Sequence, residues 1–387
     1  MTQTRSLLAV FVLTMLAVIS PVRAEDEDPP LRGKKLSEWI DLLQNGKTVD
    51  QRRVGLLAVK LIGPRKSRKV VPALIAAVRE NTEVKIRVGA ALALGDIAGK
   101  ARADDDIPID KIRDALAAVL RTDKSDPVRE ASARALGDMK DKARGVSGVL
   151  AVALKDAHAG TRTAAANALR KLGKDATEVL GELQTALKNA KLERLTRIHC
   201  ALALGRIGAP DALPAVPTLK EVLGNTKNDG EIRKACAQAL GELGKDASDA
   251  VPTLAATLTA KDSELALRRA CAEALDQMGA DARPALSALR TALKDDDQFV
   301  RSLSLHAISY MGKELGEDRK TTVLGVLTCM DDNVLEVRVA AIEALGNLGT
   351  EGLGDQAAAV IVRLTEAKRD PQKAVSNAAE VALKKLQ

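Results

Sequence analysis

The sequence predicts an all-α fold, a right-handed α-solenoid of about ten helical hairpins stacked along one axis. Three observations lead to this prediction: an amphipathic unit that recurs about every 35 residues, a second apolar segment between successive copies, and a near absence of aromatic residues. Repeats of this length are typical of solenoids, because one hairpin cannot bury its apolar faces alone. We expect the array to occupy residues 36–387.

The clearest copy of the repeated unit is EIRKACAQALGELG, at Glu231–Gly244. Its apolar residues follow the spacing of one helix face: Ile232, Cys236, Ala239, Leu240 and Leu243. This pattern predicts an amphipathic helix, and Gly244 is expected to end it.

When the copies are aligned on Gly241, the residue two positions earlier is alanine in every copy. These alanines are Ala58, Ala93, Ala135, Ala168, Ala203, Ala239, Ala274, Ala307, Ala344 and Ala382. An invariant methyl group at one helical position indicates a close contact between neighbouring helices, where a larger side chain would not fit.

A second helix is expected between these copies. The segments that predict it are Val71–Val78, Val216–Leu223, Val251–Leu258 and Arg283–Leu293, each with a proline near its start. Proline is tolerated in the first turn of a helix because the N–H group that it lacks has no partner there. Each unit is therefore expected to be a helical hairpin.

Two polar positions also recur. The last copy has Ser376 eight residues before the aligned position. The other nine copies have an arginine there: Arg52, Arg87, Arg129, Arg162, Arg197, Arg233, Arg268, Arg301 and Arg338. Six residues before this position an aspartate is frequent: Asp123, Asp156, Asp262, Asp295, Asp332 and Asp370.

The pattern resembles the HEAT-repeat family, over roughly Leu36 to Leu386, and in particular exported bacterial-type proteins with PBS-lyase HEAT-like repeats. The resemblance implies that the aspartates and arginines lie at the turn within each hairpin and bond one repeat to the next as a structural ladder. Tetratricopeptide repeats need Trp, Tyr and Phe at fixed positions, and ankyrin repeats need a TPLH-like turn. The sequence has neither.

The first 24 residues have the organisation of a Sec-type signal peptide: Arg5, then the apolar run Leu7–Ile19, then a small-x-small motif ending at Ala24. The run is too short for a stable membrane anchor. We therefore expect export to the periplasm or the medium, with no transmembrane anchor after cleavage. Residues 25–35 are expected to be an acidic, proline-containing linker, and Trp39 to cap the first hairpin.

The charge pattern does not favour nucleic acid as a partner. Without Arg5 and Arg23, 57 basic residues stand against 52 acidic ones, a formal charge of +5. Only Pro64–Lys69 forms a dense basic run, which is interpreted as a solvated loop, with contact to an anionic surface as the alternative. Neither a basic stripe nor interleaved aromatic residues is present.

No metal, cofactor or catalytic site is predicted. The three histidines, His158, His199 and His306, belong to different repeats, and none precedes a glutamate. The His-Glu pairs that hold iron in deoxyhypusine hydroxylase, a HEAT-like enzyme, are therefore absent. An aspartate-rich insertion is interpreted as solvated, with calcium binding as the alternative; its acidic residues are Asp104, Asp105, Asp106 and Asp110.

The cysteines are expected to be buried and unpaired. Cys200, Cys236 and Cys271 occupy the same position of successive repeats, and Cys329 lies in the other helix layer. Neighbouring helices lie about 8–10 Å apart, which exceeds the roughly 7 Å Cα separation that a disulfide tolerates.

These observations favour a non-catalytic scaffold that binds other proteins on the concave face of the superhelix, with a HEAT-like enzyme of the phycobilin lyase or deoxyhypusine hydroxylase type as the alternative. The identity of the partner and the oligomeric state do not follow from the sequence. The best candidate contact residues are Phe299, His306 and Tyr310, which share one side of a predicted helix. The alternative is that the two aromatic rings fill the seam to the adjacent repeat.

Overall fold

A computed structural model describes residues 30–62, 67–102 and 105–387. The chain divides into two compact units, Met1–Ile112 and Arg113–Gln387. The expected signal peptide, most of the expected linker and Asp104 lie outside the described residues.

Unit 1 contains two helical hairpins preceded by a small β-hairpin. Its elements are β1 (Pro30–Leu31), β2 (Lys34–Lys35), α2 (Leu36–Asn45), α3 (Val49–Ile62), α4 (Ser67–Glu80) and α5 (Val84–Lys100). The end of the expected linker thus forms an antiparallel strand pair. Trp39 of α2 is buried, and its indole Nε1 donates a hydrogen bond of 3.0 Å to the carbonyl oxygen of Leu31.

Unit 2 contains eight further hairpins. Its helices are α6 (Ile109–Thr122, which starts in unit 1), α7 (Asp126–Asp138), α8 (Ser147–Ala153), α9 (Ala159–Leu172), α10 (Leu180–Lys188), α11 (Arg194–Ile207), α12 (Val216–Gly224), α13 (Gly230–Leu243), α14 (Val251–Thr259), α15 (Leu265–Met278), α16 (Leu286–Ala292), α17 (Gln298–Ser309), α18 (Arg319–Thr328), α19 (Leu335–Leu353), α20 (Ala357–Ala367) and α21 (Lys373–Lys385). Short 3-10 helices lie between them: η2 (Lys140–Ala143), η3 (Gly173–Val179), η4 (Leu213–Ala215), η5 (Gly244–Ala250), η6 (Gly279–Ala285), η7 (Gly312–Asp318), η8 (Cys329–Asp331) and η9 (Gly354–Gln356).

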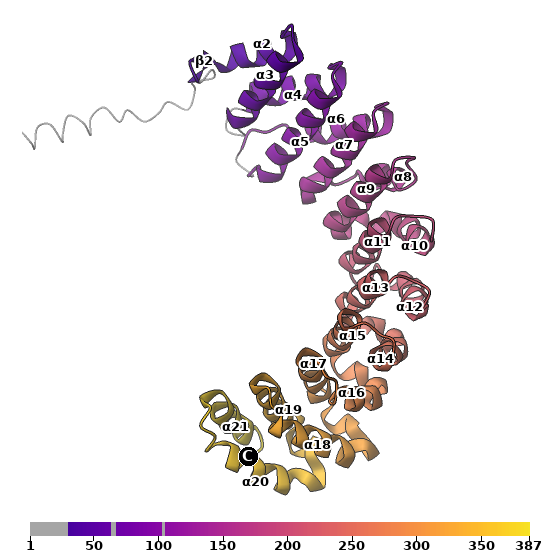
Figure 1. The fold of residues 1–387 in the computed structure, drawn as a ribbon, viewed down its shortest axis with the longest axis vertical. Helices are drawn as coiled ribbons and strands as arrows, with labels where there is room; N and C mark the ends of the chain where they lie inside the picture. The colour runs from indigo at the N-terminus through magenta and orange to yellow at the C-terminus, as the bar shows by residue number, and fades with distance from the viewer. Residues whose placement is uncertain (1–29, 63–66, 103–104) are drawn as a thin grey trace, which may run out of the picture. The chain divides into compact units, whose positions relative to one another are not determined.

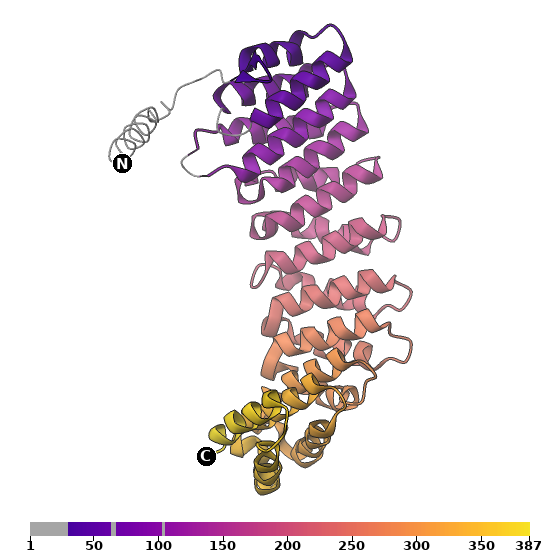
Figure 2. The same cartoon turned by 60° about the vertical axis from the view of Figure 1, so that its left-hand side comes forward.

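The helices of unit 2 form two layers. From α9 to α21 the odd-numbered helices line the inner side of a curved stack, and the even-numbered helices line its outer side (Figure 1). The inner helices lie side by side along the stack (Figure 2). The predicted α-solenoid of about ten hairpins is confirmed.

The inner helix α13 illustrates why these segments fold as predicted. Its apolar residues, Ile232 and Leu240 among them, are buried on one face. At its start, the carboxylate of Asp229 accepts a hydrogen bond from the N–H of Glu231, and at its end Gly244 has a φ of +63° that L residues rarely adopt. The helix therefore begins and ends where the sequence predicts.

Glycine and alanine bring the inner helices close together. A Cβ atom added to a glycine at the aligned position would lie within about 3 Å of the alanine Cα in the next repeat. The pairs are Gly137–Ala168, Gly205–Ala239, Gly241–Ala274 and Gly346–Ala382. The recurring alanines therefore lie at helix–helix contacts, as the sequence indicates.

Two of the proline-containing segments differ from the prediction. Helix α4 begins at Ser67, so Pro72 lies inside it and not in its first turn. The missing N–H group of Pro72 would bond only to the carbonyl of Arg68, near the start of the helix, so the loss is tolerated. Pro284 lies in η6, and the α-helix expected from Arg283 begins only at Leu286.

The four cysteines are free and buried, as predicted. Burial raises the pKa of Cys200, Cys236 and Cys271 to about 12. The thiolate form, which is the reactive form of cysteine, is therefore strongly disfavoured.

Candidate functional site

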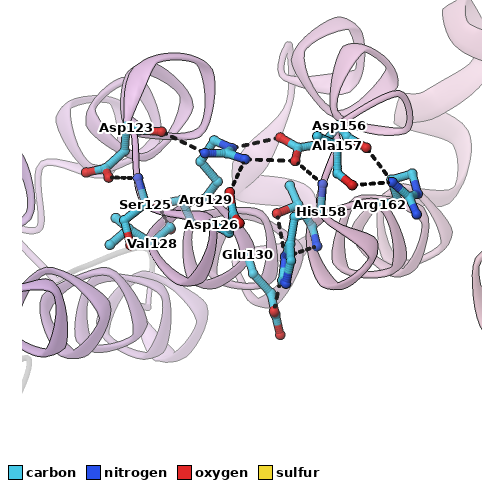
Figure 3. Close-up of polar contacts among 12 residues, drawn as sticks. Asp123, Ser125, Asp126, Val128, Arg129, Glu130, Asp156, Ala157, His158 and Arg162 are labelled. Atoms are coloured by element: carbon cyan, nitrogen blue, oxygen red, sulfur yellow. Dashed lines mark hydrogen bonds and ion pairs between the residues drawn. The ribbon is translucent and has the colours of Figure 1, made fainter.

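The turn of each hairpin positions the inner helices through arginine side chains. In the rung shown in Figure 3, Arg129 Nε and Nη2 donate hydrogen bonds of 2.7 and 2.9 Å to the two carboxylate oxygens of Asp156 in the next repeat. Arg129 Nη1 also donates to the carbonyl oxygen of Asp123 in its own turn, at 2.9 Å. One guanidinium thus joins two successive turns.

The aspartate has a second role within its own turn. The Asp156 carboxylate accepts a hydrogen bond of 2.8 Å from the N–H of His158, which closes an Asx turn. The backbone carbonyl oxygen of Asp156 accepts a hydrogen bond of 2.6 Å from Arg162 Nη1. Further rungs repeat the arrangement. Arg268 pairs with Asp295 and Arg301 with Asp332, whereas Arg162 pairs with a glutamate, Glu193.

Other predicted ladder residues also bond to carbonyl oxygens of their own turns. Arg338, Arg52 and Arg87 donate to the carbonyl oxygens of Asp332, Gly46 and Asn81, each at 2.8 Å, and in unit 1 Arg52 Nη2 lies 3.7 Å from a carboxylate oxygen of Glu83. The Asp370 carboxylate accepts from the N–H of Gln372.

At three predicted positions the arrangement differs. The Nε atoms of Arg197 and Arg233 donate instead to the carbonyl oxygens of Leu187 and Leu223, ten residues earlier. Asp262 is exposed, and no hydrogen bond joins it to an arginine of the described residues. Arg268 donates to the carbonyl of Ser263, because Ser263 is the residue that is buried in this turn.

The rungs hold their carboxylates in the charged form. The hydrogen bonds from Arg129 lower the pKa of Asp156, and those from Arg162 lower the pKa of Glu193. In the Arg301–Asp332 pair, burial alone would raise the pKa of Asp332, but the hydrogen bonds to Arg301 and to a backbone N–H outweigh it and lower the pKa. The ladder therefore joins the turns of successive repeats through hydrogen bonds between charged groups.

The inner face of unit 2 is formed by the sides of the odd-numbered helices that their neighbours do not cover. Helix α15, for example, packs between α13 and α17 and against α14, so its exposed side chains, such as Glu273 and Gln277, point to the inner side. The equivalent positions of α17 are His306 and Tyr310, and Phe299 lies seven residues before His306, on the same side of the helix.

The candidate contact residues lie on this inner face. Phe299 and Tyr310 expose 51% and 56% of their surface, while Val300, Ser304, Ala307, Ile308 and Met311 are buried. Phe299 lies in the first turn of α17 and Tyr310 immediately follows its last residue. Eleven residues at 1.5 Å each place the two Cα atoms about 16 Å apart along the helix axis, so the two residues mark the two ends of one helix.

Phe299 also touches the neighbouring repeat. The guanidinium of Arg269 lies 4.6 Å from the centre of its ring, and Arg269 Nε donates a hydrogen bond of 2.9 Å to the Asp297 carboxylate. Phe299 therefore contacts the seam to the neighbouring repeat while about half of its surface remains exposed.

A shallow hollow of about 240 Å³ lies on the inner face farther along the stack, across α9 to α15. Its lining includes Arg170, Arg206, Glu242 and Gln277. Burial raises the pKa of Glu242, against the opposing effects of Arg206 and Arg170. Sequence reasoning did not single out these residues, because a charged residue on a helix surface is usually only solvated.

The histidines do not converge. His158 caps α9, where its Nδ1 accepts a hydrogen bond from the N–H of Thr161, while His199 and His306 belong to α11 and α17. Within the described part of the chain, no group of three or more His, Cys, Asp or Glu residues could hold a metal ion. In the same residues, no helix has both the length and the apolar character needed to cross a membrane.

The stacked hairpins and their arginine turns agree with comparisons to known proteins. The family model for HEAT repeats matches residues 113–191, 183–266 and 216–309, and the model for the PBS lyase HEAT-like repeat matches residues 337–370. The chain belongs to the HEAT-repeat family. No curated protein matches it.

Solved structures share the fold. An engineered protein of known crystal structure matches over 90% of this chain and 98% of its own, with a TM-score of 0.58 and 21% identity. A chain of the Kap95:Nup1 complex matches 97% of this HEAT-repeat chain with a TM-score of 0.60 and 14% identity, and this chain spans 53% of its length. At these identities the likeness concerns the fold alone.

Proposed function

We propose that this HEAT-repeat protein is a non-catalytic scaffold that binds another protein on the inner face of unit 2, with Phe299 and Tyr310 as contact residues. The observation that carries the proposal is that the two aromatic rings are more than half exposed in a chain that otherwise has almost none. Aromatic residues contribute to interfaces out of proportion to their number.

The shape of the inner face supports the same function. Its helices are pre-positioned by the arginine rungs at the turns, so a partner would meet a preformed surface and would not have to order it. A HEAT-like lyase or hydroxylase is the alternative, and bound iron or a coloured cofactor in the purified protein would favour it.

Partner capture followed by hydrogen exchange tests this proposal. A polypeptide that co-purifies with the tagged protein from the exported fraction should slow amide exchange in α15, α17 and α19. Protection confined to the outer helices α14, α16 and α18 would contradict the proposed binding face.

We also propose that the protein is exported and that signal cleavage follows Ala24. The support is the order of Arg5, the apolar run Leu7–Ile19 and the small-x-small motif. Amino-terminal sequencing of the protein recovered from the periplasm or medium should begin at Glu25. Recovery of only the uncleaved chain, in the cytoplasm, would contradict this proposal.

A further inference from the structure

Helix α17 lies between two helices that carry unpaired acidic residues. Helix α15 packs on one side of α17 and presents Glu273 and Asp276, and α19 packs on the other side and presents Glu336 and Glu343. The three glutamates are exposed, and none of the four carboxylates forms an ion pair within the described residues. We call these four residues, together with Phe299 and Tyr310, the acidic–aromatic face.

Other acidic residues of the inner face are paired. On α7 to α13, four of them lie within 4 Å of a basic side chain: Asp138 with Lys171, Glu130 with Arg134, Glu231 with Lys234, and Glu242 with Arg206. Pairing cancels most of the local field. The unpaired negative charge of the inner face therefore lies on α15 and α19, the two helices that flank the aromatic side chains of α17.

One carboxylate of this face lacks a donor. Asp276 is half-buried, and its Oδ1 atom is shielded from solvent without a hydrogen-bond partner. An acceptor in this position costs free energy until a donor reaches it. Burial raises the pKa of Asp276, an effect that His306 of α17 opposes and that Glu273 of its own helix reinforces.

Arg269 of α15 contacts α17 and shows that a cationic group can lie against an aromatic ring of this face. Arg269 is already used by Asp297, through Nε and Nη2, and its guanidinium lies over Phe299. A cation above an aromatic ring is stabilised by the ring quadrupole. Tyr310, at the other end of α17, is exposed.

We propose that the acidic–aromatic face binds a segment of a partner protein that carries lysine or arginine side chains. The proposal rests on the proposed scaffold function and adds the chemistry of its partner. Lysine and arginine supply the positive charge that pairs with these carboxylates. Because the mature chain is basic overall, at +5, such a segment would be attracted to this face and not to the molecule as a whole.

A binding assay with two labelled peptides tests the inference directly. The probes are fluorescein-labelled peptides of alternating arginine and serine, and of alternating glutamate and serine, followed by fluorescence anisotropy at low ionic strength. The test variant combines Glu273→Gln, Glu336→Gln and Glu343→Gln. The control variant combines Glu130→Gln, Asp138→Asn and Glu231→Gln, which removes the same number of charges from paired acids of the same inner face.

We expect the arginine peptide to bind the wild-type protein, and the test variant to bind it roughly tenfold more weakly. The control variant should keep the wild-type affinity, and the glutamate peptide should not bind. Equal weakening in both variants would indicate attraction to net charge alone and would overturn the inference.

The outcome also separates this inference from the scaffold function. If the arginine peptide does not bind while a co-purifying polypeptide is lost on Phe299→Ala with Tyr310→Ala, the cationic partner is wrong and the aromatic contact site stands. If that polypeptide binds the aromatic variant normally, the scaffold site itself is wrong.

Discussion

Gly205 and Ala239 are in direct contact across two inner helices. A Cβ atom on Gly205 would lie 2.8 Å from the Cα of Ala239 and 3.1 Å from its Cβ. Backbone atoms on both sides make this contact rigid, so neither residue has room to grow. The spacing of the inner layer, and with it the geometry of the inner face, depends on contacts of this kind.

Enlarging Ala239 should therefore destabilise the array locally. Ala239→Leu forces extra carbon atoms against Gly205 and is expected to cost about 1–3 kcal/mol. Since stability in a solenoid is a sum of repeat and nearest-neighbour terms, urea unfolding followed by circular dichroism should show a second transition or an earlier midpoint. Ala256→Leu, at an exposed position of α14, is the control and should leave the curve unchanged.

A single wild-type transition for Ala239→Leu would mean that the close contact does not exist in solution. The packing of every inner helix would then have to be reconsidered.

Replacing the arginine of a bidentate rung by lysine should lower the stability of the protein. Arg301 is buried, and its Nε and Nη2 each donate a hydrogen bond of 2.8 Å to the Asp332 carboxylate. A lysine keeps the charge but cannot supply the planar pair of donors. Arg301→Lys should lower the free energy of unfolding by about 1–3 kcal/mol, measured by urea denaturation.

Arg134→Lys is the matched control, because Arg134 is exposed and pairs only with Glu130 of its own helix. Its effect should stay within about 0.5 kcal/mol. Equal effects of the two substitutions would refute the ladder as a source of stability.

The ladder also predicts acid sensitivity. Arg129 lowers the pKa of Asp156 in the folded state, so folding releases protons and the stabilisation is complete above the unfolded pKa of about 3.9. It is lost as the pH falls below that value, toward the lower folded pKa. Asp156→Asn should therefore flatten the decline of the urea midpoint between neutral and acid pH, and a decline as steep as that of wild type would contradict the assignment.

The cysteines should be inert in the folded protein. With the pKa of Cys236 and Cys271 raised to about 12, and that of Cys329 to about 11, iodoacetamide at mildly alkaline pH should label none of them within the time that labels a small thiol. All four should react in urea. Rapid labelling of the native protein would show that these helices open readily.

The repeat determines most of the fold because each hairpin uses the same contacts. The pattern around Ala239 predicts one helix, and Gly244 predicts its end. The same spacing recurs along the chain. The helix starts are less predictable, since Pro72 is tolerated inside α4 whereas Pro284 lies in a 3-10 turn before α16.

The site could be predicted only in part. Helical spacing alone places Phe299 and Tyr310 on one side of α17. It cannot tell that Asp276 Oδ1 lacks a donor or that Glu343 is unpaired, because both depend on side chains from the adjacent repeats. In the same way, the position of Asp262 in the repeat predicts a rung, but in that turn Arg268 donates its hydrogen bond to the carbonyl oxygen of the buried Ser263.

The most direct test of the scaffold function measures thermal stability and partner binding on the same protein, with Phe299→Ala and Tyr310→Ala combined. Both side chains are exposed, so we expect a melting temperature close to that of wild type. We also expect the polypeptide that co-purifies with the wild-type protein to be lost. A lowered melting temperature with partner binding intact would contradict the account, because the two rings would then serve the seam between repeats and not a partner.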